Sequence, residues 1–268
     1  MHASVVCGAV RLRSRAPTPV AAAWGVDRMR FALGLDHDLE PFRRRFASDR
    51  LLAPAIRLRP WLRPARFPEP FEALAWAIIE QLIETERAWG IQRRLVWRFG
   101  RLSPCRRLRD APSCRSMAGR APAELEACDL SAGRSLTLIR AAREVSGGRT
   151  DLSAQEAAWR RLRRIPGIGS WTLEKLAFHG QGRDDQLPAG DLAYIKLVGV
   201  REGLGRRATE DEVREFFAPY APYQALAGIY ALRAATLASD GSSEPFRNAR
   251  RPSARTGPRA PRRAAARL

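Results

Sequence analysis

Residues 162–197 contain the pattern that most restricts what this chain can fold into. Two predicted helices are joined there by the short turn Pro166-Gly-Ile-Gly169. Gly167 and Gly169 let the backbone turn tightly and leave its N–H groups uncovered. Ser170 can cap the next helix, whose positive end then lies beside those N–H groups. The turn is therefore suited to binding a backbone phosphate, although an ordinary turn between two helices has the same pattern.

The chain around this turn is also predicted to be helical, with no convincing alternating strand between Asp27 and Ser239. The clearest helix begins near Pro70, where apolar side chains recur with the period of an amphipathic helix. They are Phe71, Leu74, Ala75, Ile78, Ile79 and Leu82. Capping boxes at residues 153–156 and 209–212 predict two further helix starts. The expected fold class is all-α.

The two ends of the chain differ from this helical part. Residues 1–26 have only a weak strand pattern, and we expect a short N-terminal segment there. Residues 27–240 form the expected helical domain. Residues 241–268 hold eight arginines and one acid, so their charge is 8 − 1, or +7, and we expect a disordered basic tail. The tail is either an unselected extension or a source of non-specific phosphate affinity.

Charge and cysteine usage narrow the function classes. The chain has 47 Lys and Arg against 28 Asp and Glu, a net charge of +19, which favours a polyanionic partner such as nucleic acid. A GC-rich genome would also raise the arginine content. The four cysteines lack C-x-x-C spacing and do not cluster with histidine, so zinc or iron–sulfur ligands are not expected. No apolar run is long enough to span a membrane, and a reducing, cytoplasmic location is expected.

The segment Ile165-Pro-Gly-Ile-Gly-Ser-Trp171-Thr resembles the helix-hairpin-helix of DNA glycosylases. Leu187-Pro-Ala-Gly-Asp191 resembles the loop of that superfamily that ends in the catalytic aspartate. Residues 77–83 resemble the DNA-inserting segment of the 3-methyladenine DNA glycosylase II branch. This resemblance implies a helix-hairpin-helix DNA glycosylase fold, in which two helical subdomains flank a DNA- and base-binding cleft. It also implies a shortened N-terminal segment, because the prototype has a strand-rich domain there.

Asp191 is the residue on which the expected chemistry depends. A carboxylate beside C1′ stabilises the positive charge that develops on the deoxyribose and can orient the attacking water. An alternative role is structural, because Asp191 precedes the apolar run that begins at Leu192 and can cap a helix. The two roles are compatible. The resemblance favours catalysis.

Trp171 lies where lyase-type members of the superfamily have a catalytic lysine, so the resemblance implies a monofunctional enzyme. An indole also suits stacking on an alkylated purine, although an ordinary core tryptophan is the alternative. Lys175, one helical turn later, departs from the prototype, which has an aromatic residue there. It is either a solvated surface lysine or a pocket residue that could repel a cationic base or support lyase activity.

The resemblance assigns further residues to DNA or base contacts. Leu82 would be the wedge that fills the stack after base flipping, with Gln81 beside it near the pocket. Core packing is the alternative for Leu82, and also for Tyr223 and Tyr230, which would otherwise line the base pocket. The hairpin contacts to the DNA backbone would come from Pro166, Gly167, Ile168, Gly169, Ser170 and Thr172.

These expectations lead to a monofunctional glycosylase that hydrolyses the N-glycosidic bond of alkylated purines in duplex DNA and starts base excision repair. We expect a monomer that needs no cofactor beyond a monovalent cation that could bind at the hairpin with DNA. One alternative is a glycosylase for deaminated or oxidised purines, with lyase activity through Lys175. Another is a non-catalytic protein of the same fold that binds damaged DNA.

Overall fold

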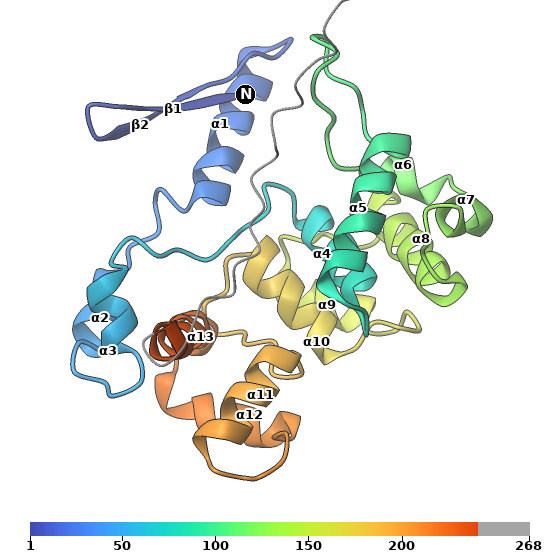
Figure 1. The fold of residues 1–268 in the computed structure, drawn as a ribbon. Helices are drawn as coiled ribbons and strands as arrows, with labels where there is room; N and C mark the ends of the chain where they lie inside the picture. Colours follow the sequence, from blue (N-terminus) through green and yellow to red (C-terminus); the bar gives the residue numbers. More distant parts are fainter. Residues whose placement is uncertain (241–268) are drawn as a thin grey trace, which may run out of the picture.

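A computed structural model describes residues 1–240, which form thirteen α-helices and one short antiparallel hairpin of two strands (Figure 1). The strands are β1 (His2–Val6) and β2 (Ala9–Arg13). The helices are α1 (Pro19–Leu33), α2 (Glu40–Arg45), α3 (Ala53–Leu58), α4 (Pro70–Glu80), α5 (Thr85–Phe99), α6 (Cys114–Ala118), α7 (Pro122–Glu126), α8 (Ala132–Ser146), α9 (Gln155–Leu162), α10 (Ser170–Lys175), α11 (Leu192–Arg201), α12 (Glu210–Phe217) and α13 (Gln224–Asp240). A π-helical turn, η1 (Leu176–Gly180), continues α10, and a 3-10 turn, η2 (Ala218–Tyr220), follows α12.

The first hydrophobic core lies within a continuous stretch of the chain, from α4 to α10. Helix α4 is its centre: eight of its eleven residues are buried, and it packs against α5, α8, α10 and η1. The apolar period seen in the sequence explains this burial up to Ile79. We call this part the first subdomain.

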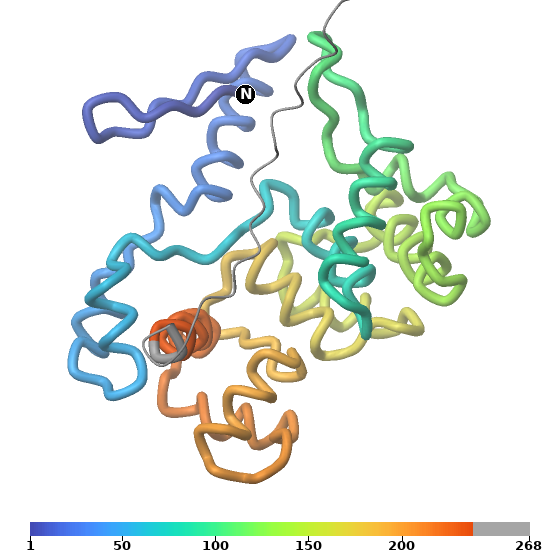
Figure 2. The backbone as a smooth tube through the Cα atoms, in the orientation of Figure 1, coloured from blue at the N-terminus to red at the C-terminus, as the bar shows by residue number. Residues whose placement is uncertain are grey.

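The second core combines two distant parts of the chain. Helices α2 and α3 pack with α11, α12 and α13, and Figure 2 shows the backbone of α3 beside that of α13. The buried Tyr230 hydroxyl donates a hydrogen bond to the carbonyl oxygen of Leu62 at 3.0 Å and joins the two parts. We call this part the second subdomain. Because its first helices precede the first subdomain in the chain, the two subdomains are intertwined.

The N-terminal segment holds a hairpin where the sequence indicated a single weak strand. Its turn is Cys7-Gly8, with φ values of 50° and 75°, and β1 and β2 pair in register from His2 with Arg13 to Val6 with Ala9. Helix α1 begins at Pro19, eight residues before the expected helical start. The Thr18 side chain caps it by accepting a hydrogen bond from the Ala21 N–H. The basic tail at 241–268 lies outside the described residues.

The two expected capping boxes have different outcomes. At Thr209 the prediction is confirmed, because its hydroxyl accepts from the Glu212 N–H and the Glu212 carboxylate accepts from the Thr209 N–H. At Ser153 it is wrong: the hydroxyl binds the Asp151 carboxylate instead, and α9 begins at Gln155. Within residues 1–240, no helix is both long and apolar enough to cross a membrane.

Candidate active site and nucleic-acid interface

The turn between α9 and α10 is held by contacts to α8. Gly167 has φ +91°, and a Cβ atom there would lie 2.6 Å from Thr137 Oγ1, so both the conformation and the space require glycine. The same Thr137 hydroxyl donates to the Pro166 carbonyl at 2.8 Å. At Gly169 nothing would meet a Cβ within 4 Å. The backbone of Gly169 is therefore open to a ligand.

The other predicted hairpin residues fall into two groups. Pro166 is exposed at the surface with the two glycines. The side chains of Ile168 and Thr172 are buried in the first subdomain, with exposed fractions of 5% and 1%, so neither side chain can contact DNA. Ser170 does not cap α10, whose N-cap residue is Gly169. Its hydroxyl donates to Glu210 Oε1 at 3.2 Å.

Gln81 forms hydrogen bonds to the hairpin turn. Its Nε2 atom donates to the Gly167 carbonyl at 2.7 Å and to Thr172 Oγ1 at 2.8 Å. Both amide hydrogens are thus used between α4 and the hairpin turn. These contacts fix the distance between the α4–α5 turn and the hairpin, and the place of Gln81 near the base stays a prediction.

Leu82 is fully exposed and does not belong to the core. Its side chain has a relative exposure of 104%, and its φ is +52°, a strained value for leucine. Helix α4 ends at Glu80, so Leu82 does not lie on its buried face, and the core alternative for Leu82 is wrong. A strained, unpacked leucine at the tip of the α4–α5 turn is the geometry that an inserting wedge requires.

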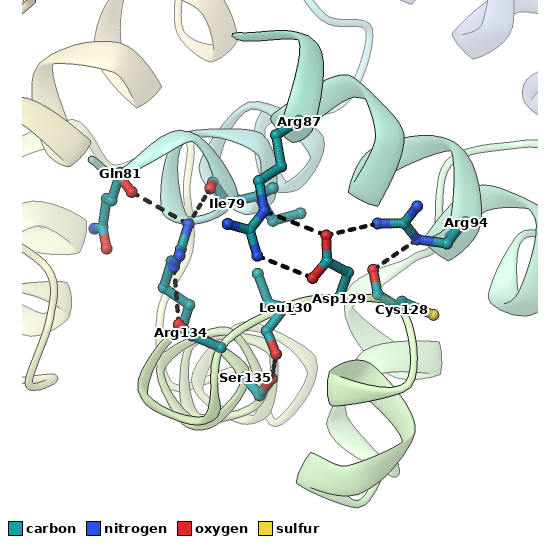
Figure 3. A network of polar contacts seen from close by, with 10 residues as sticks. Ile79, Gln81, Arg87, Arg94, Cys128, Asp129, Leu130, Arg134 and Ser135 are labelled. Atoms are coloured by element: carbon teal, nitrogen blue, oxygen red, sulfur yellow. Dashed lines mark hydrogen bonds and ion pairs between the residues drawn. The ribbon is translucent and has the colours of Figure 1, made fainter. Parts of the chain in front are cut away.

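Arg134 from α8 holds this turn in place (Figure 3). Its Nη1 atom donates to the Ile79 carbonyl at 2.9 Å and to the Gln81 carbonyl at 3.2 Å, the last carbonyls of α4. Partial burial lowers the pKa of Arg134. No pattern in the sequence indicates this role, because Arg134 is more than fifty residues from the turn and is one of many arginines.

Beside Arg134, two arginines of α5 converge on one carboxylate. Arg87 and Arg94 both bind Asp129 at 3.0 Å, and Arg94 also donates to the Cys128 carbonyl at 2.9 Å (Figure 3). The hydrogen bond from Arg87 lowers the pKa of the Asp129 carboxyl. This network fixes α5 against the chain that leads into α8, and so supports the turn that carries Leu82.

Asp191 is the N-cap of α11. One carboxylate oxygen, Oδ1, accepts a hydrogen bond from the Ala193 N–H at 3.0 Å, and the Asp191 N–H donates to the Pro188 carbonyl at 2.8 Å. The capping role that the sequence allowed is thus present. Within residues 1–240 the structure gives Oδ2 no hydrogen-bond partner, so the second oxygen is free for other chemistry.

The loop before Asp191 brings it near Trp171. A Cβ atom on Gly190 would lie 3.6 Å from Trp171 Cδ1, so the indole packs against this loop. The Trp171 Nε1 atom is buried without a hydrogen-bond partner among the described residues. Trp171 therefore lies beside the loop that ends in Asp191, the residue that the resemblance placed with it at the reaction centre.

Lys175 is not a solvated surface lysine. Its Nζ atom lies 3.1 Å from Glu80 Oε2 and 5.5 Å from the centre of the Trp171 ring. The other Glu80 oxygen accepts from Gln92 Nε2 at 3.1 Å. Glu80 thus belongs to the site as the partner of Lys175. No local pattern could have identified this pairing.

A second charged group lies on the other side of the hairpin. Arg214 binds Glu174 at 2.7 Å and also pairs with Glu210. Burial raises the pKa of Glu174, although the hydrogen bond from Arg214 opposes this. These contacts join α10 of the first subdomain to α12 of the second.

His179 is a residue that the sequence analysis missed. Its Nδ1 atom lies 2.7 Å from the Ala65 carbonyl, which as an acceptor requires Nδ1–H and leaves Nε2 without a proton on the neutral ring. Burial, together with the charge of Lys175, lowers its pKa to about 4, while Asp191 acts in the opposite direction. His179 is thus electrostatically coupled to both predicted site residues.

The two tyrosines predicted for the base pocket belong to the second subdomain. Tyr230 is fully buried and packs on Phe42 with ring centres 5.0 Å apart. Tyr223 packs edge-on against Phe42 and lies near Phe46. We therefore assign Tyr230 to the core. Nothing in the described residues connects Tyr223 to Trp171 or Asp191.

Metal ligands do not gather in the part of the chain that the structure describes, where no three His, Cys, Asp or Glu side chains form a group that could hold an ion. The cysteines are free thiols. At the hairpin, the Pro166 and Gly167 carbonyls already accept hydrogen bonds from Thr137 and Gln81.

No protein-family model matches the chain. It is 27% identical over 208 residues to a DNA-3-methyladenine glycosylase of Bacillus subtilis, and the matched region covers 74% of this chain and 68% of the relative. Its fold is similar to that of a 3-methyladenine DNA glycosylase from Archaeoglobus fulgidus, with a TM-score of 0.73, 22% identity, and coverage of 86% of this chain and 80% of that one. A Schizosaccharomyces pombe 3-methyladenine DNA glycosylase in complex with abasic DNA matches with a TM-score of 0.59 and 25% identity, over 69% of this chain and 91% of that one.

Proposed function

We propose that the chain is a member of the helix-hairpin-helix DNA glycosylase superfamily and that it is a monofunctional DNA glycosylase that releases alkylated purines from duplex DNA. The observation that carries the proposal is the neighbourhood of Trp171 and the loop that ends in Asp191, beside an open hairpin turn. The chain contains these features in one place, and each has a role in removing a flipped base.

DNA binding would begin at the hairpin. The open backbone at Gly169 leaves room for a phosphate, and the strained, exposed Leu82 is available to fill the space that a flipped nucleotide leaves in the stack. Gln81 connects these two elements by its hydrogen bonds to the hairpin. A phosphate contact and an inserted wedge would therefore keep a fixed spacing along the DNA.

Asp191 would then act on the sugar. As the base leaves, positive charge develops on the deoxyribose, and a carboxylate beside C1′ stabilises it. The Oδ1 atom is used by the Ala193 N–H, which fixes the carboxylate, while Oδ2 can face the sugar and orient the attacking water. Bond breakage leaves the electron pair on the base. Water adds its hydroxyl group to C1′ and gives its other proton to the Asp191 carboxylate, from which the proton passes to solvent. A cationic alkylated base needs no strong general acid for this step.

Two features support a monofunctional reaction. Trp171 has no amine where lyase-type members have their lysine, and the Nζ atom of Lys175 is engaged by Glu80. We expect no covalent adduct when the protein is treated with borohydride on abasic DNA. If an adduct forms and Lys175→Ala abolishes it, the enzyme has lyase activity and this part of the proposal is wrong.

The choice of 3-methyladenine-type substrates rests on the Bacillus subtilis relative, whose name gives that activity. The test is chromatography of the bases that the wild-type protein releases from methylated, deaminated and oxidised duplex DNA. Release of methylated purines at the highest rate is the expected result. Release of only hypoxanthine or 8-oxoguanine would assign another lesion, and binding without release of any base would favour a damage-binding protein.

A further inference from the structure

An open groove lies along α5, away from the residues assigned to base release. Its volume is about 660 Å³. It is lined by Arg93, Arg94, Trp97, Arg98, Ala127 and Cys128, from α5 and the end of α7. Nothing in the proposed glycosylase reaction uses this groove, which we call the α5 groove.

Trp97 is the aromatic side chain of the α5 groove. It is 73% exposed, which is a large exposure for an indole. The Arg109 guanidinium carbon lies 4.9 Å from its ring centre, and Arg109 also donates to the Gly100 carbonyl at 3.0 Å. The indole is therefore supported on one face, while most of its surface stays accessible. A supported and exposed aromatic ring is a ready platform for stacking.

The charged side chains of the groove are arranged around this ring. Arg94 is fixed by Asp129 and by the Cys128 carbonyl. Neither Arg93 nor Arg98 forms an ion pair with any carboxylate of residues 1–240, and Arg98 lies over the Phe99 ring at 5.4 Å. The groove therefore presents two arginines that form no ion pair within residues 1–240, together with Arg109, next to an open indole.

The pattern continues along the helix. Trp89, Arg93 and Trp97 follow one another at intervals of four residues, which places them on one side of α5. Trp89 is 56% exposed. From Trp89 to Trp97 the helix rises by about 12 Å, at about 1.5 Å per residue. This stripe alternates an aromatic platform, a cation and a second platform.

We propose that the α5 groove is a second DNA site that binds single-stranded DNA. Arginines with no acidic partner are complementary to phosphates, and stacking on an exposed indole requires bases that are not already stacked in a duplex. A protein partner would need acidic groups of its own to match these arginines, and no feature of the groove calls for one. The choice of a single strand rests on the groove, whereas the choice of DNA over RNA rests on the proposed function.

The α5 groove is separate from the base-release site. Helix α5 begins three residues after Leu82 and leads away from that turn (Figure 1). Trp97 is twelve residues along the helix from Thr85, or about 18 Å. The two regions share one support, because Asp129 binds both Arg87 near the turn and Arg94 in the groove (Figure 3). One protein could thus hold a lesion-containing duplex and a nearby unpaired strand.

The test is fluorescence anisotropy of a labelled twelve-nucleotide oligo-dT with the full chain and its variants. Trp97→Ala should weaken binding about tenfold, within the range of stacking one base on an aromatic ring, and Trp97→Phe should retain most of the affinity. The double variant Arg93→Ala/Arg98→Ala should lower the salt dependence of log K by about 1.4, since each lost phosphate contact on a single strand contributes about 0.7. All three side chains are exposed, so the fold should persist.

Matched controls separate the groove from the general positive charge. Trp61→Ala removes another tryptophan of similar exposure, 65%, and Arg57→Ala removes another exposed arginine. Both should leave oligo-dT binding unchanged. Base release from duplex DNA should be unaffected by every groove variant. If the wild type releases no base, the proposed function is wrong, but the oligo-dT measurements still decide whether the groove binds single-stranded DNA.

Three results would overturn the proposal. Unchanged oligo-dT binding by Trp97→Ala and the double variant would mean that the groove is no DNA site. Equal affinity for oligo-rU would make the choice of DNA wrong. Equal weakening of undamaged duplex binding by Trp97→Ala would show a duplex contact instead of a single-strand site.

Discussion

Gly167 and Gly169 lie in the same turn, and the structure gives them different reasons to be glycine. Gly167 has a positive φ, and Thr137 occupies the space where a Cβ would lie. Gly169 has an ordinary extended conformation and open space around it. The first glycine is required by the fold. The second is required only if another molecule approaches the turn.

This difference leads to paired substitutions. Gly167→Ala should lower the free energy of unfolding by about 1–3 kcal/mol, because alanine is strained at this φ and meets Thr137. Gly169→Ala should change it by less than about 1 kcal/mol but weaken duplex DNA binding, because the methyl group fills the open space. Urea denaturation and a DNA-binding titration measure both. If Gly169→Ala binds DNA normally, no phosphate approaches this residue.

For single residues, the sequence indicated the local chemistry but not the side-chain contacts between distant segments. Asp191 and Trp171 stand in short motifs whose residue types the chemistry requires, and the fold places Trp171 beside the loop that ends in Asp191. The resemblance placed Gln81 near the pocket and left Lys175 open as a surface or pocket residue, and neither pattern indicated their contacts to Gly167 and Glu80. Such pairs come from distant elements, and one sequence has no pattern that records them.

The α4–α5 turn is the element whose construction is most unusual. It carries an exposed leucine at positive φ, while Arg134 and Gln81 fix the end of α4 on either side. The helical period of α4 predicted its buried face correctly up to Ile79. The prediction that this face continues to Leu82 is wrong, because Leu82 lies beyond the end of the helix and is exposed. Where a helix ends depends on tertiary hydrogen bonds such as those of Arg134, which periodicity does not contain.

Shortening Leu82 tests the role of this turn. Leu82→Ala should leave stability within about 0.5 kcal/mol of the wild type, because the side chain contacts nothing in the free protein. Base release should fall about tenfold, since an inserted side chain offsets part of the unstacking cost of a few kcal/mol. Leu58→Ala, another exposed leucine at 63%, is the matched control and should change neither. Unimpaired base release by Leu82→Ala would exclude the wedge role.

On the scale of the whole molecule, the chain passes from the first core to the second within a few residues of α10 and η1. Leu176 belongs to the first core and Phe178 to the second. The sequence predicted two helical subdomains by resemblance, and the structure has two cores whose chain segments are intertwined. The N-terminal hairpin was predicted only as a weak strand, because its five-residue strands are mostly exposed and lack a clear apolar alternation.

His179 at this junction predicts a pH dependence of stability. Its pKa is about 4 in the folded protein against an ordinary value of 6.5, because burial disfavours the charged ring. As pH falls from about 6.5 towards 4, the unfolded chain takes up a proton that the folded chain does not, and stability is lost. Between pH 7 and pH 5, the wild type should lose more free energy of unfolding than His179→Asn. Equal losses in urea titrations would contradict this coupling.

The most direct test of the account is single-turnover base release from methylated duplex DNA by the wild type and Asp191→Asn. Asparagine also caps helices well, so the variant should keep α11 and bind the same DNA. We expect rapid release of methylated purines by the wild type and a rate of release that is at least about a hundredfold lower in the variant. This factor corresponds to about 3 kcal/mol of transition-state stabilisation. Equal release by both proteins, with DNA binding intact, would show that Asp191 only caps α11 and would contradict the central claim.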